Sequence, residues 1–443
     1  MKKLYREAIQ LGEQRGAEQI ELFILKGTTD VIQFEKNGII ASESKTLTGI
    51  SVRAYTNKGL GLATTTLLTK DSILNAVKKA VTLSKSSPPD ELFKSLPESK
   101  TTYPTVDGLD DKAIRNLSAA SLANLAIEGI DSALEEQEVL VSGSFNRVSV
   151  EESIYNSLGI YVEEKYSSLT GIIYAKAEKN DDIATSWDYQ KTRSKKAFNP
   201  KKIGQKAAKN AVSLLGARKI ESGKLPIILD HRSTLDTLSS ILSIGLDAYE
   251  VILGTAFFKD RLGEQITNNK LTIIDNPLYS GGVGSAAFDD EGVPHHKTTL
   301  IKDGVAQSFF SNSYCANVLD IENTAHAYKA SLSGKPHPEL TQLQIKPGEW
   351  SEEELLEETK RGLLIKDTAI SPSGGTPNIS ALIDQGFLIE NGEIKHPIKE
   401  TMVGITIFEL LKRINAITKT ILEEGGTKSP MIRIEPVKIA GGK

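Results

Sequence analysis

The chain has 443 residues, of which 39% are hydrophobic and 25% are charged, so it can bury a full core and is too long for one ordinary domain. Its formal net charge of -4 disfavours nucleic-acid binding, because a duplex-binding surface normally needs a strongly basic field. The single cysteine, Cys315, excludes an internal disulfide framework and fits a reducing compartment.

The N-terminal residues argue against a membrane location. Residues 1–7 carry charges where a signal peptide needs an apolar run, and no apolar stretch elsewhere is long enough to span a bilayer. We therefore expect a cytoplasmic protein without a membrane partner.

Residues 1–105 predict a helix, an antiparallel meander and a second helix. The first helix is expected over residues 2–15, and strands are expected over residues 20–26, 30–35, 39–43, 49–56 and 60–65. The turn signals Asn37-Gly38 and Asn57-Lys58-Gly59 make neighbouring strands antiparallel. A helix begins after Thr69, and residues 86–108, rich in Ser, Pro, Lys and Asp, resemble a linker.

Residues 106–220 repeat this order as a middle α+β unit. Helical periodicity covers residues 110–134, strands are expected over residues 139–146, 148–156, 160–170 and 170–179, and a helix follows over residues 200–215. The order is compatible with a duplication, but no residue-level repeat supports one.

Residues 221–443 predict a strand-rich C-terminal domain. An apolar strand at residues 224–229 precedes a long amphipathic helix, whose apolar residues recur at three- and four-residue steps from Leu235 to Leu253. Further helices are expected over residues 351–360 and 406–424, and strands over residues 271–275, 298–301, 305–310, 342–346, 363–368, 380–390, 393–398 and 431–437. Because the strands follow one another without crossover helices, we predict an α+β fold whose C-terminal sheet is antiparallel and can close on itself.

Two parts of the chain resemble a known family. One is Gly49-Ile50-Ser51-Val52-Arg53, followed by Gly59-Leu60-Gly61-Leu62-Ala63-Thr64. The other is the strand at residues 222–229 with the later turn Phe288-Asp289-Asp290-Glu291-Gly292-Val293-Pro294. These segments are similar to the TldD/PmbA family, whose TldD-type members carry a zinc-protease motif, His-Glu-x-x-x-His, on the helix between that strand and that turn.

The zinc ligands of the family are missing here. Such a site needs two histidines one turn apart on a helix, a third protein ligand, and a carboxylate to activate water. Matching the strand at Pro226 places the motif's His, Glu and second His at Ser239, Ser240 and Ile244. Residues 425–430 also lack the family's late cysteine ligand. The chain thus resembles the TldE/PmbA branch, and we expect neither catalytic residues nor metal ligands in it.

The remaining motifs have structural interpretations. The resemblance assigns a structural or cleft-shaping role to the family turn, which comprises Asp289, Asp290, Glu291 and Gly292. His295-His296 follows this turn, but adjacent side chains on an extended segment point to opposite faces, so the two would rarely share one ion. The other histidines, isolated in the sequence, are His231, His326, His337 and His396.

Nucleotide and serine-hydrolase sites are weakly supported. Residues 282–287 match a dinucleotide fingerprint as a string, but an acidic turn follows where a helix should open. Ser285 and Ser373 have glycine neighbours without evident His and Asp partners. The turn at residues 371–378 is typical of a loop, and in a strand-rich domain such a loop can line a cleft for an extended peptide.

The resemblance implies a subunit of a TldD/TldE-type metalloprotease complex that cleaves small or unfolded peptides. Zinc would be bound by a TldD-like partner, where it would polarise the attacking water while the Glu of the partner's motif moves the proton. This chain would bind no cofactor and would be inactive alone. One alternative remains open: a non-enzymatic regulatory or binding protein of the DNA gyrase modulator type, acting as a homodimer. The sequence does not support a third hypothesis, a hydrolase using another site.

Overall fold

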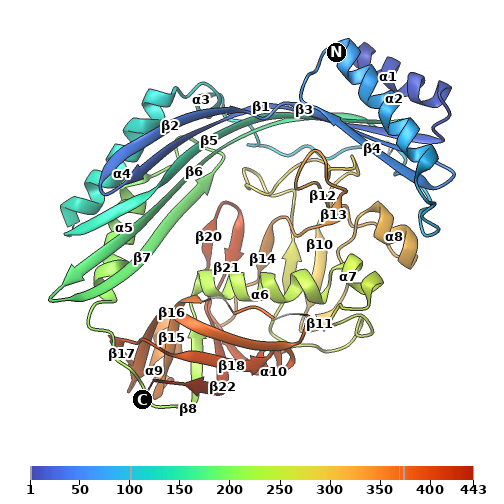
Figure 1. Cartoon of the computed structure of the whole chain (residues 1–443). Helices are drawn as coiled ribbons and strands as arrows, with labels where there is room; N and C mark the ends of the chain where they lie inside the picture. Colours follow the sequence, from blue (N-terminus) through green and yellow to red (C-terminus); the bar gives the residue numbers. More distant parts are fainter. Residues whose placement is uncertain (1, 100–101, 137, 369, 373–374, 443) are drawn as a thin grey trace.

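The computed structural model describes residues 2–99, 102–136, 138–368, 370–372 and 375–442. A curved sheet built by the N-terminal half arches over the C-terminal half, with helices on its outer face near both ends (Figure 1). Helices and mostly antiparallel strands follow one another in blocks, which confirms the predicted α+β class. Within the described residues, no helix is long and apolar enough to cross a membrane.

One large sheet holds the strands of both N-terminal units. Its order is β4-β3-β1-β5-β6-β7, with β2 paired to the second half of β1, and its pairings are antiparallel. The strands are β1 (Gln19–Glu35), β2 (Gly38–Thr46), β3 (Gly49–Thr56), β4 (Gly59–Thr65), β5 (Val139–Asn156), β6 (Tyr161–Lys179) and β7 (Asp182–Thr192).

Helices cover the outer, convex face of this sheet because alternate strand residues there are apolar. Leu22 and Ile24 of β1 pack under the first two helices, and Ile32 and Phe34 pack under the later ones. Thr69 begins the second helix as predicted, since its side chain accepts a hydrogen bond from the backbone N–H of Ser72. The helices are α1 (Lys2–Gln14), α2 (Lys70–Ser86), α3 (Lys112–Arg115), α4 (Ala119–Glu136) and α5 (Pro200–Ser213).

Several strands are longer than the sequence pattern predicts. The segments expected at residues 20–26 and 30–35 form one strand, β1, and β5 and β6 are continuous in the same way. The polar residues at the expected breaks are paired across strands: Arg147 of β5 lies opposite Asp30 of β1 and donates a hydrogen bond to its carboxylate. The sequence pattern also does not predict β7, which forms a strand by pairing with β6.

Five strands of the C-terminal half close into a ring, as the sequence allowed. β8 pairs with β22, β22 with β18, β18 with β16, β16 with β15, and β15 returns to β8 through the one parallel pairing of the ring. The strands are β8 (Gly223–Leu229), β15 (Arg361–Thr368), β16 (Asn378–Glu390), β18 (Met402–Thr406) and β22 (Ile432–Ala440), and β17 (Glu393–Pro397) and β19 (Ile414–Ile417) extend the sheet.

A second sheet of short strands lies between this ring and the arch (Figure 1). Its order is β11-β10-β9-β14-β21-β20. Its strands are β9 (Ile273–Asp275), β10 (Thr298–Lys302), β11 (Val305–Ala306), β14 (Leu343–Ile345), β20 (Leu422–Glu424) and β21 (Thr427–Ser429), and a separate pair is β12 (Ala327–Tyr328) with β13 (His337–Pro338). The helices of this half are α6 (His231–Gly245), α7 (Ala248–Leu253), α8 (Ser313–Leu319), α9 (Glu352–Glu357) and α10 (Ile407–Lys412).

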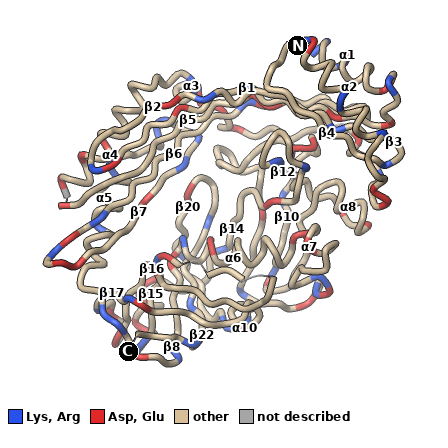
Figure 2. The backbone as a smooth tube through the Cα atoms, in the orientation of Figure 1, with Lys and Arg blue, Asp and Glu red and all other residues tan. Residues whose placement is uncertain are grey.

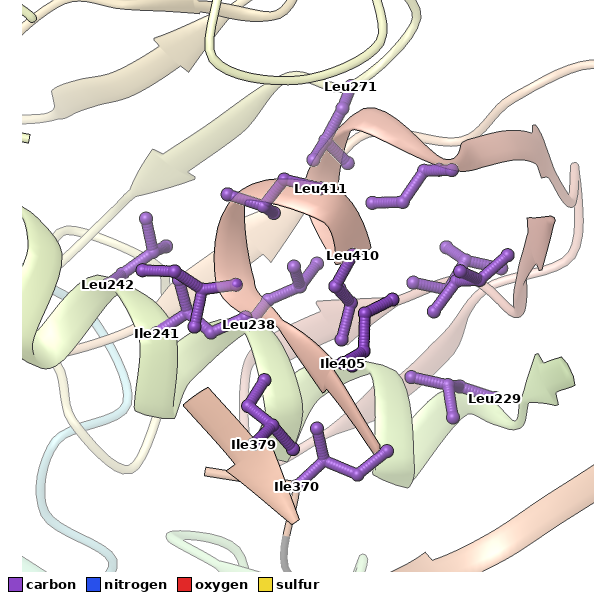
Figure 3. Packing of buried hydrophobic residues seen from close by; sticks show 14 of the residues in the cluster. Leu229, Leu238, Ile241, Leu242, Leu271, Ile370, Ile379, Ile405, Leu410 and Leu411 are labelled. Carbon is purple, nitrogen blue, oxygen red and sulfur yellow. The ribbon is translucent and has the colours of Figure 1, made fainter. Parts of the chain in front are cut away.

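The largest hydrophobic core of the chain lies around α6. Leu238, Ile241 and Leu242 are buried on one face of this helix and belong to the same cluster as Ile405 and Leu410 (Figure 3). The predicted amphipathic face is therefore confirmed, because its apolar positions are the buried ones.

Three predicted helices are wrong in extent. The helix expected over residues 110–134 is divided into α3 and α4. In the segment 406–424 only α10 is helical, and Ile414–Ile417 forms β19, paired with β22. Its isoleucines fit a helical period, but they also suit a strand, and a neighbouring strand decided between the two. The helix expected from Leu235 to Leu253 is two helices, since Asp247 accepts a hydrogen bond from the N–H of Tyr249 and so begins α7.

We expect Gly61→Ala to destabilise the N-terminal unit by about 1–3 kcal/mol, the usual effect of overpacking. Gly61 lies in β4, and a Cβ there would overlap the carbonyl oxygen of Ala80 in α2. Gly404→Ala in β18 is the matched control, because a Cβ at that glycine meets open space. Urea unfolding should shift for the first variant and stay near wild type for the second; equal midpoints would contradict the close packing of α2 on β4.

Candidate functional site

The predicted family turn, Asp289 to Gly292, is held rigidly under the concave face of the arch. Oδ1 of Asp289 accepts hydrogen bonds from the backbone N–H groups of Glu291 and Val293, and its Oδ2 accepts one from Ala327 of β12. Gly292 has a φ of +80°, a backbone conformation that favours glycine. The turn is therefore fixed both by its own backbone and by a neighbouring strand.

Glu291 of this turn joins a buried ion network that links the two halves of the chain. Arg53 donates to both Glu21 carboxylate oxygens and to Glu291 Oε1, 2.9 Å away, and Lys329 Nζ lies 2.7 Å from Glu21 Oε1. These side chains are at most 5% exposed. Burial alone would raise the pKa of Glu21, but Arg53 and Lys329 outweigh it and hold that pKa below its usual value.

Elsewhere, basic and acidic residues are interspersed along the described chain (Figure 2).

A cavity of about 340 Å³ adjoins the family turn. It lies between the concave face of β5 and β6 and the loops of the C-terminal half, and we call it the inner cavity. Its walls are polar and apolar in similar measure, and the residues that matter below are Glu152, Glu164, Tyr166, Arg193, Ser285, Asp290, His295 and His326.

Glu152 lies within electrostatic reach of two other carboxyl groups of the inner cavity. Glu152 of β5 and Glu164 of β6 are direct cross-strand neighbours, and Asp290 approaches them from the family turn. Burial, together with Asp290 and Glu164, raises the pKa of Glu152 well above its usual value. Burial also raises the pKa of Glu164 to about 7, although a hydrogen bond from the N–H of Ala287 opposes the shift.

Arg193, just after β7, joins three segments at the cavity wall. Its guanidinium donates to the backbone carbonyls of Leu109, Val283 and Ser285 at 2.8 to 3.0 Å, and it lies over the ring of Tyr166. Its N–H groups are thus directed at carbonyl oxygens on either side of the cavity, although its charge also acts on Glu164 and opposes the rise in the pKa of that carboxyl group.

A groove of about 440 Å³ continues from the inner cavity along the concave face. It shares Tyr166, Lys191, Arg193 and Val283 with the cavity. We call it the outer groove, and its other residues, mainly hydroxyl-bearing and apolar, are Thr29, Val31, Asn146, Val148, Ser168 and Thr170. Cavity and groove together form an interdomain cleft.

The positions matched to the family's zinc motif lie on α6, away from this cavity. Ser239, Ser240 and Ile244 are all partly buried, outside the core-facing stripe of the helix. Arg232, two turns before Ser239 on the same face, pairs with Asp188 of β7 and Glu424 of β20. That face of α6 therefore looks toward the edge of the arch.

The two stretches compared with the family's zinc ligands are neighbours in space. α6 packs against β21, which lies within residues 425–430. Hydroxyl and alkyl side chains at Ser239, Ser240 and Ile244 do not fit a zinc ion, which takes imidazole, thiolate or carboxylate ligands. Within the described ranges, no three His, Cys, Asp or Glu groups are placed to hold one metal ion.

Three of the histidines and serines singled out from the sequence, Ser285, His295 and His326, come together at the inner cavity. His295 is 6% exposed and lines the inner cavity, whereas the side chain of His296 is 42% exposed. His326 is fully buried, with Nε2 3.4 Å from Asp275. Ser285 lines the inner cavity, and Ser373, in the loop predicted over residues 371–378, lies outside the described residues.

Sequence reasoning missed Glu21, Glu152, Glu164 and Lys329, and it quoted Arg53 within the family resemblance without giving it a role. One signal was present: in β5 the alternate residues Val148, Val150 and Ile154 are apolar, and Glu152 interrupts them with a charge. A charged residue at a core-facing strand position often marks a partner or a site. Lys329 gave no such signal, because its partner Glu21 is 308 residues away.

We expect Glu164→Gln to change how stability depends on pH. A carboxyl group whose pKa is about 7 when folded and near 4.5 when unfolded stabilises the protein below pH 4.5, and this contribution is lost as pH rises through 7. Relative to wild type, the free energy of unfolding of Glu164→Gln should increase by about 2 kcal/mol between pH 5 and pH 8, as measured by urea unfolding.

Glu163→Gln is the matched control for this measurement. Burial acts to raise the pKa of Glu163, but hydrogen bonds from Lys2 and Tyr155 outweigh burial and lower that pKa. The stability that this carboxylate contributes is therefore lost only as pH falls below 4.5. The difference in the free energy of unfolding between Glu163→Gln and wild type should be the same at pH 5 and pH 8. A Glu164→Gln offset that also stays constant would contradict the burial of this carboxyl group.

Comparison with protein families matches nearly the whole chain. Models of the PmbA/TldA metallopeptidases match their domain 1 at residues 20–84, their central domain at residues 112–215 and their C-terminal domain at residues 222–441. These are the units in which the chain builds the two parts of the arch and the closed ring.

Individual relatives are similar over the same length. A metalloprotease of Methanocaldococcus jannaschii is 25% identical over 84% of this chain and 83% of its own, and the metalloprotease PmbA homolog of Buchnera aphidicola is 26% identical over 95% and 93%. The crystal structure of TldE from Thermococcus kodakarensis matches 99% of this chain and 100% of its own with a TM-score of 0.89 at 22% identity, which shows a shared fold.

Proposed function

The chain belongs to the PmbA/TldD metallopeptidase family, and from this premise we propose that it is the non-catalytic, TldE/PmbA-like subunit of a TldD/TldE-type complex. It would hold a small or unfolded peptide, which a zinc-bearing TldD-like partner cleaves. The observation that carries this proposal is the composition of α6 at the positions of the family's motif, where Ser239, Ser240 and Ile244 offer no metal ligand.

The interdomain cleft supports a peptide-holding role. The outer groove follows the concave face of the arch past Val31, Val148 and Thr170, so its wall alternates apolar and hydroxyl side chains. An extended peptide needs such a wall, because its side chains alternate between two faces while its backbone seeks hydrogen bonds. The inner cavity adds a polar end to this groove.

This chain's own part in the reaction would be binding and orientation. A peptide held along the arch loses conformational freedom before it meets the partner's metal, which lowers the entropic part of the barrier. Zinc on the partner would supply the activated water, and no proton-transfer step is assigned to residues of this chain.

The test uses the full chain, a TldD-like partner, and their mixture. We expect elemental analysis to find no stoichiometric zinc in this chain, and an unfolded peptide to be cleaved only by the mixture. Val148→Arg, which blocks the outer groove, should abolish cleavage by the mixture, whereas Leu140→Arg, at a 48% exposed position of the same strand, should not. Zinc binding with turnover by this chain alone would overturn the proposal, and gyrase captured without any protease partner would favour a regulatory protein instead.

A further inference from the structure

The inner cavity places like charges where a strand pair normally avoids them. Glu152 and Glu164 lie directly opposite each other on β5 and β6, and like-charged cross-strand neighbours destabilise a sheet. Asp290 adds a third carboxylate, and one of its oxygens accepts a hydrogen bond from the backbone N–H of Lys329. Such an arrangement is relieved either by protonation of a carboxyl group, as the raised pKa of Glu152 reflects, or by a positive charge that enters the cavity.

The nearest cations are committed to other partners. Lys329 Nζ is bound to Glu21 in the ion network, and Arg193 donates to three backbone carbonyls. Glu152 is only 9% exposed, yet among the described residues its carboxylate has no hydrogen bond or ion pair. A buried carboxylate without a protein partner, at the wall of a cavity, points to a ligand that enters the cavity.

Two residues that line the same cavity each hold a buried polar atom without a described partner. Ser285 is 1% exposed and His295 is 6% exposed, and Oγ of the serine and Nδ1 of the histidine have no hydrogen-bond partner in the described part of the chain. Both atoms can accept a hydrogen bond, so they suit a ligand that carries several donors.

The shape of the site favours an ammonium group over a metal ion. Within the described residues, no three carboxylate, imidazole or thiol groups converge as a metal ion requires. An ammonium group has three N–H donors that can be shared among separated acceptors.

We infer that the inner cavity binds the ammonium group of a peptide, with Glu152 as its principal anionic partner. This inference rests on the proposed peptide-holding function and adds what the cleft recognises. The ammonium group comes from the peptide's N-terminus or from a lysine side chain, and the rest of the peptide extends into the outer groove, which shares a wall with the cavity.

Calorimetric titration of the full chain tests this inference with defined probes. The probes are tetra-alanine amide with a free N-terminus, its N-acetylated form, N-acetyl-Lys-Ala-Ala-Ala amide, and n-butylammonium chloride. We expect at least tenfold tighter binding of the free-amine peptide than of its acetylated form. If the lysine peptide matches the free-amine peptide, the site takes a side-chain ammonium; if it behaves like the acetylated form, the site takes the N-terminus. Either result supports the inference.

Matched variants locate the effect. Glu152→Gln keeps the size of the side chain and should remove the preference for an ammonium group, and Glu164→Gln should weaken it. Glu151→Gln, next in sequence on the opposite face of β5 and paired with Lys165, should leave it unchanged. Melting curves check that each variant is folded, and removal of a like charge makes Glu152→Gln at least as stable as wild type.

The outcomes separate this inference from the function it extends. Equal affinity for the free and acetylated peptides, or an unchanged preference in Glu152→Gln, overturns the ammonium site and leaves a peptide-holding cleft. Binding of n-butylammonium that is lost in Glu152→Gln, without binding of any peptide, supports the site and contradicts the peptide-holding function. No binding of any probe overturns both.

Discussion

Arg53→Met is expected to lower the free energy of unfolding by about 3–5 kcal/mol, the usual loss when one partner of a buried ion pair is removed. Arg53 is 4% exposed and donates to Glu21 and to Glu291. Among the described residues, Glu291 without this guanidinium retains only the backbone N–H of Ser313 as a hydrogen-bond partner, and Glu21 retains Lys329. The variant would therefore bury a carboxylate that has lost its compensating charge.

The measurement is guanidinium unfolding combined with hydrogen exchange of the backbone. Because a chain of several units need not unfold in one step, exchange should be followed separately in β1, in β3 and in the segment around Glu291. Lys58→Met is the control, since Lys58 forms an exposed pair with Glu91 and its loss should cost less than about 1 kcal/mol. Similar effects of the two substitutions would show that the buried network does not hold the two halves together.

Arg193→Met is expected to destabilise the chain by about 3 kcal/mol and to loosen the linker against the C-terminal half. The carbonyls of Leu109 and Ser285, which are buried, and that of Val283, which is partly buried, would lose a donor. Each unsatisfied buried carbonyl costs about 1–3 kcal/mol before relaxation. Hydrogen exchange should accelerate around residues 107–111 and 283–287, more than in the core of α6.

Two further substitutions check the role of the guanidinium. Arg193→Lys keeps the charge but not the planar fork of donors, so it should recover only part of the lost stability. Lys195→Met, two residues along the chain, removes a positive charge away from these carbonyls and should stay near wild type. Full recovery by lysine would show that charge alone, rather than the three hydrogen bonds, stabilises this joint.

Local pattern was sufficient for most elements of the fold. The capping residue Thr69 begins α2, the turn Asn57-Lys58-Gly59 joins β3 to β4, and the apolar stripe of α6 is buried. These features depend on neighbours within a few residues, which the sequence displays directly. The helix predicted over residues 406–424 was wrong in extent because the apolar spacing of this segment fits both a helix and strands. The pairing of β19 with β22 decided between the two.

The candidate site was predictable only in part. The family turn at Asp289 to Gly292 and the absence of zinc ligands at Ser239, Ser240 and Ile244 could be read from the chain, since each is a short string of residue types. Glu152 could have been noticed as a charge on an apolar strand face. The meeting of Glu152 with Glu164 and Asp290 required the register of β5 on β6 and the docking of a loop more than a hundred residues away.

The sequence by itself determined the α+β class, the family and the residues unavailable for metal binding, because composition, periodicity and short motifs are properties of neighbouring residues. Only the tertiary structure decided that two N-terminal units share one sheet, that five strands close into a ring, and that Glu21, Arg53, Glu291 and Lys329 form one network. Long-range pairing brings together groups that are remote in the chain, and the burial that perturbs their pKa values exists only once the halves have docked.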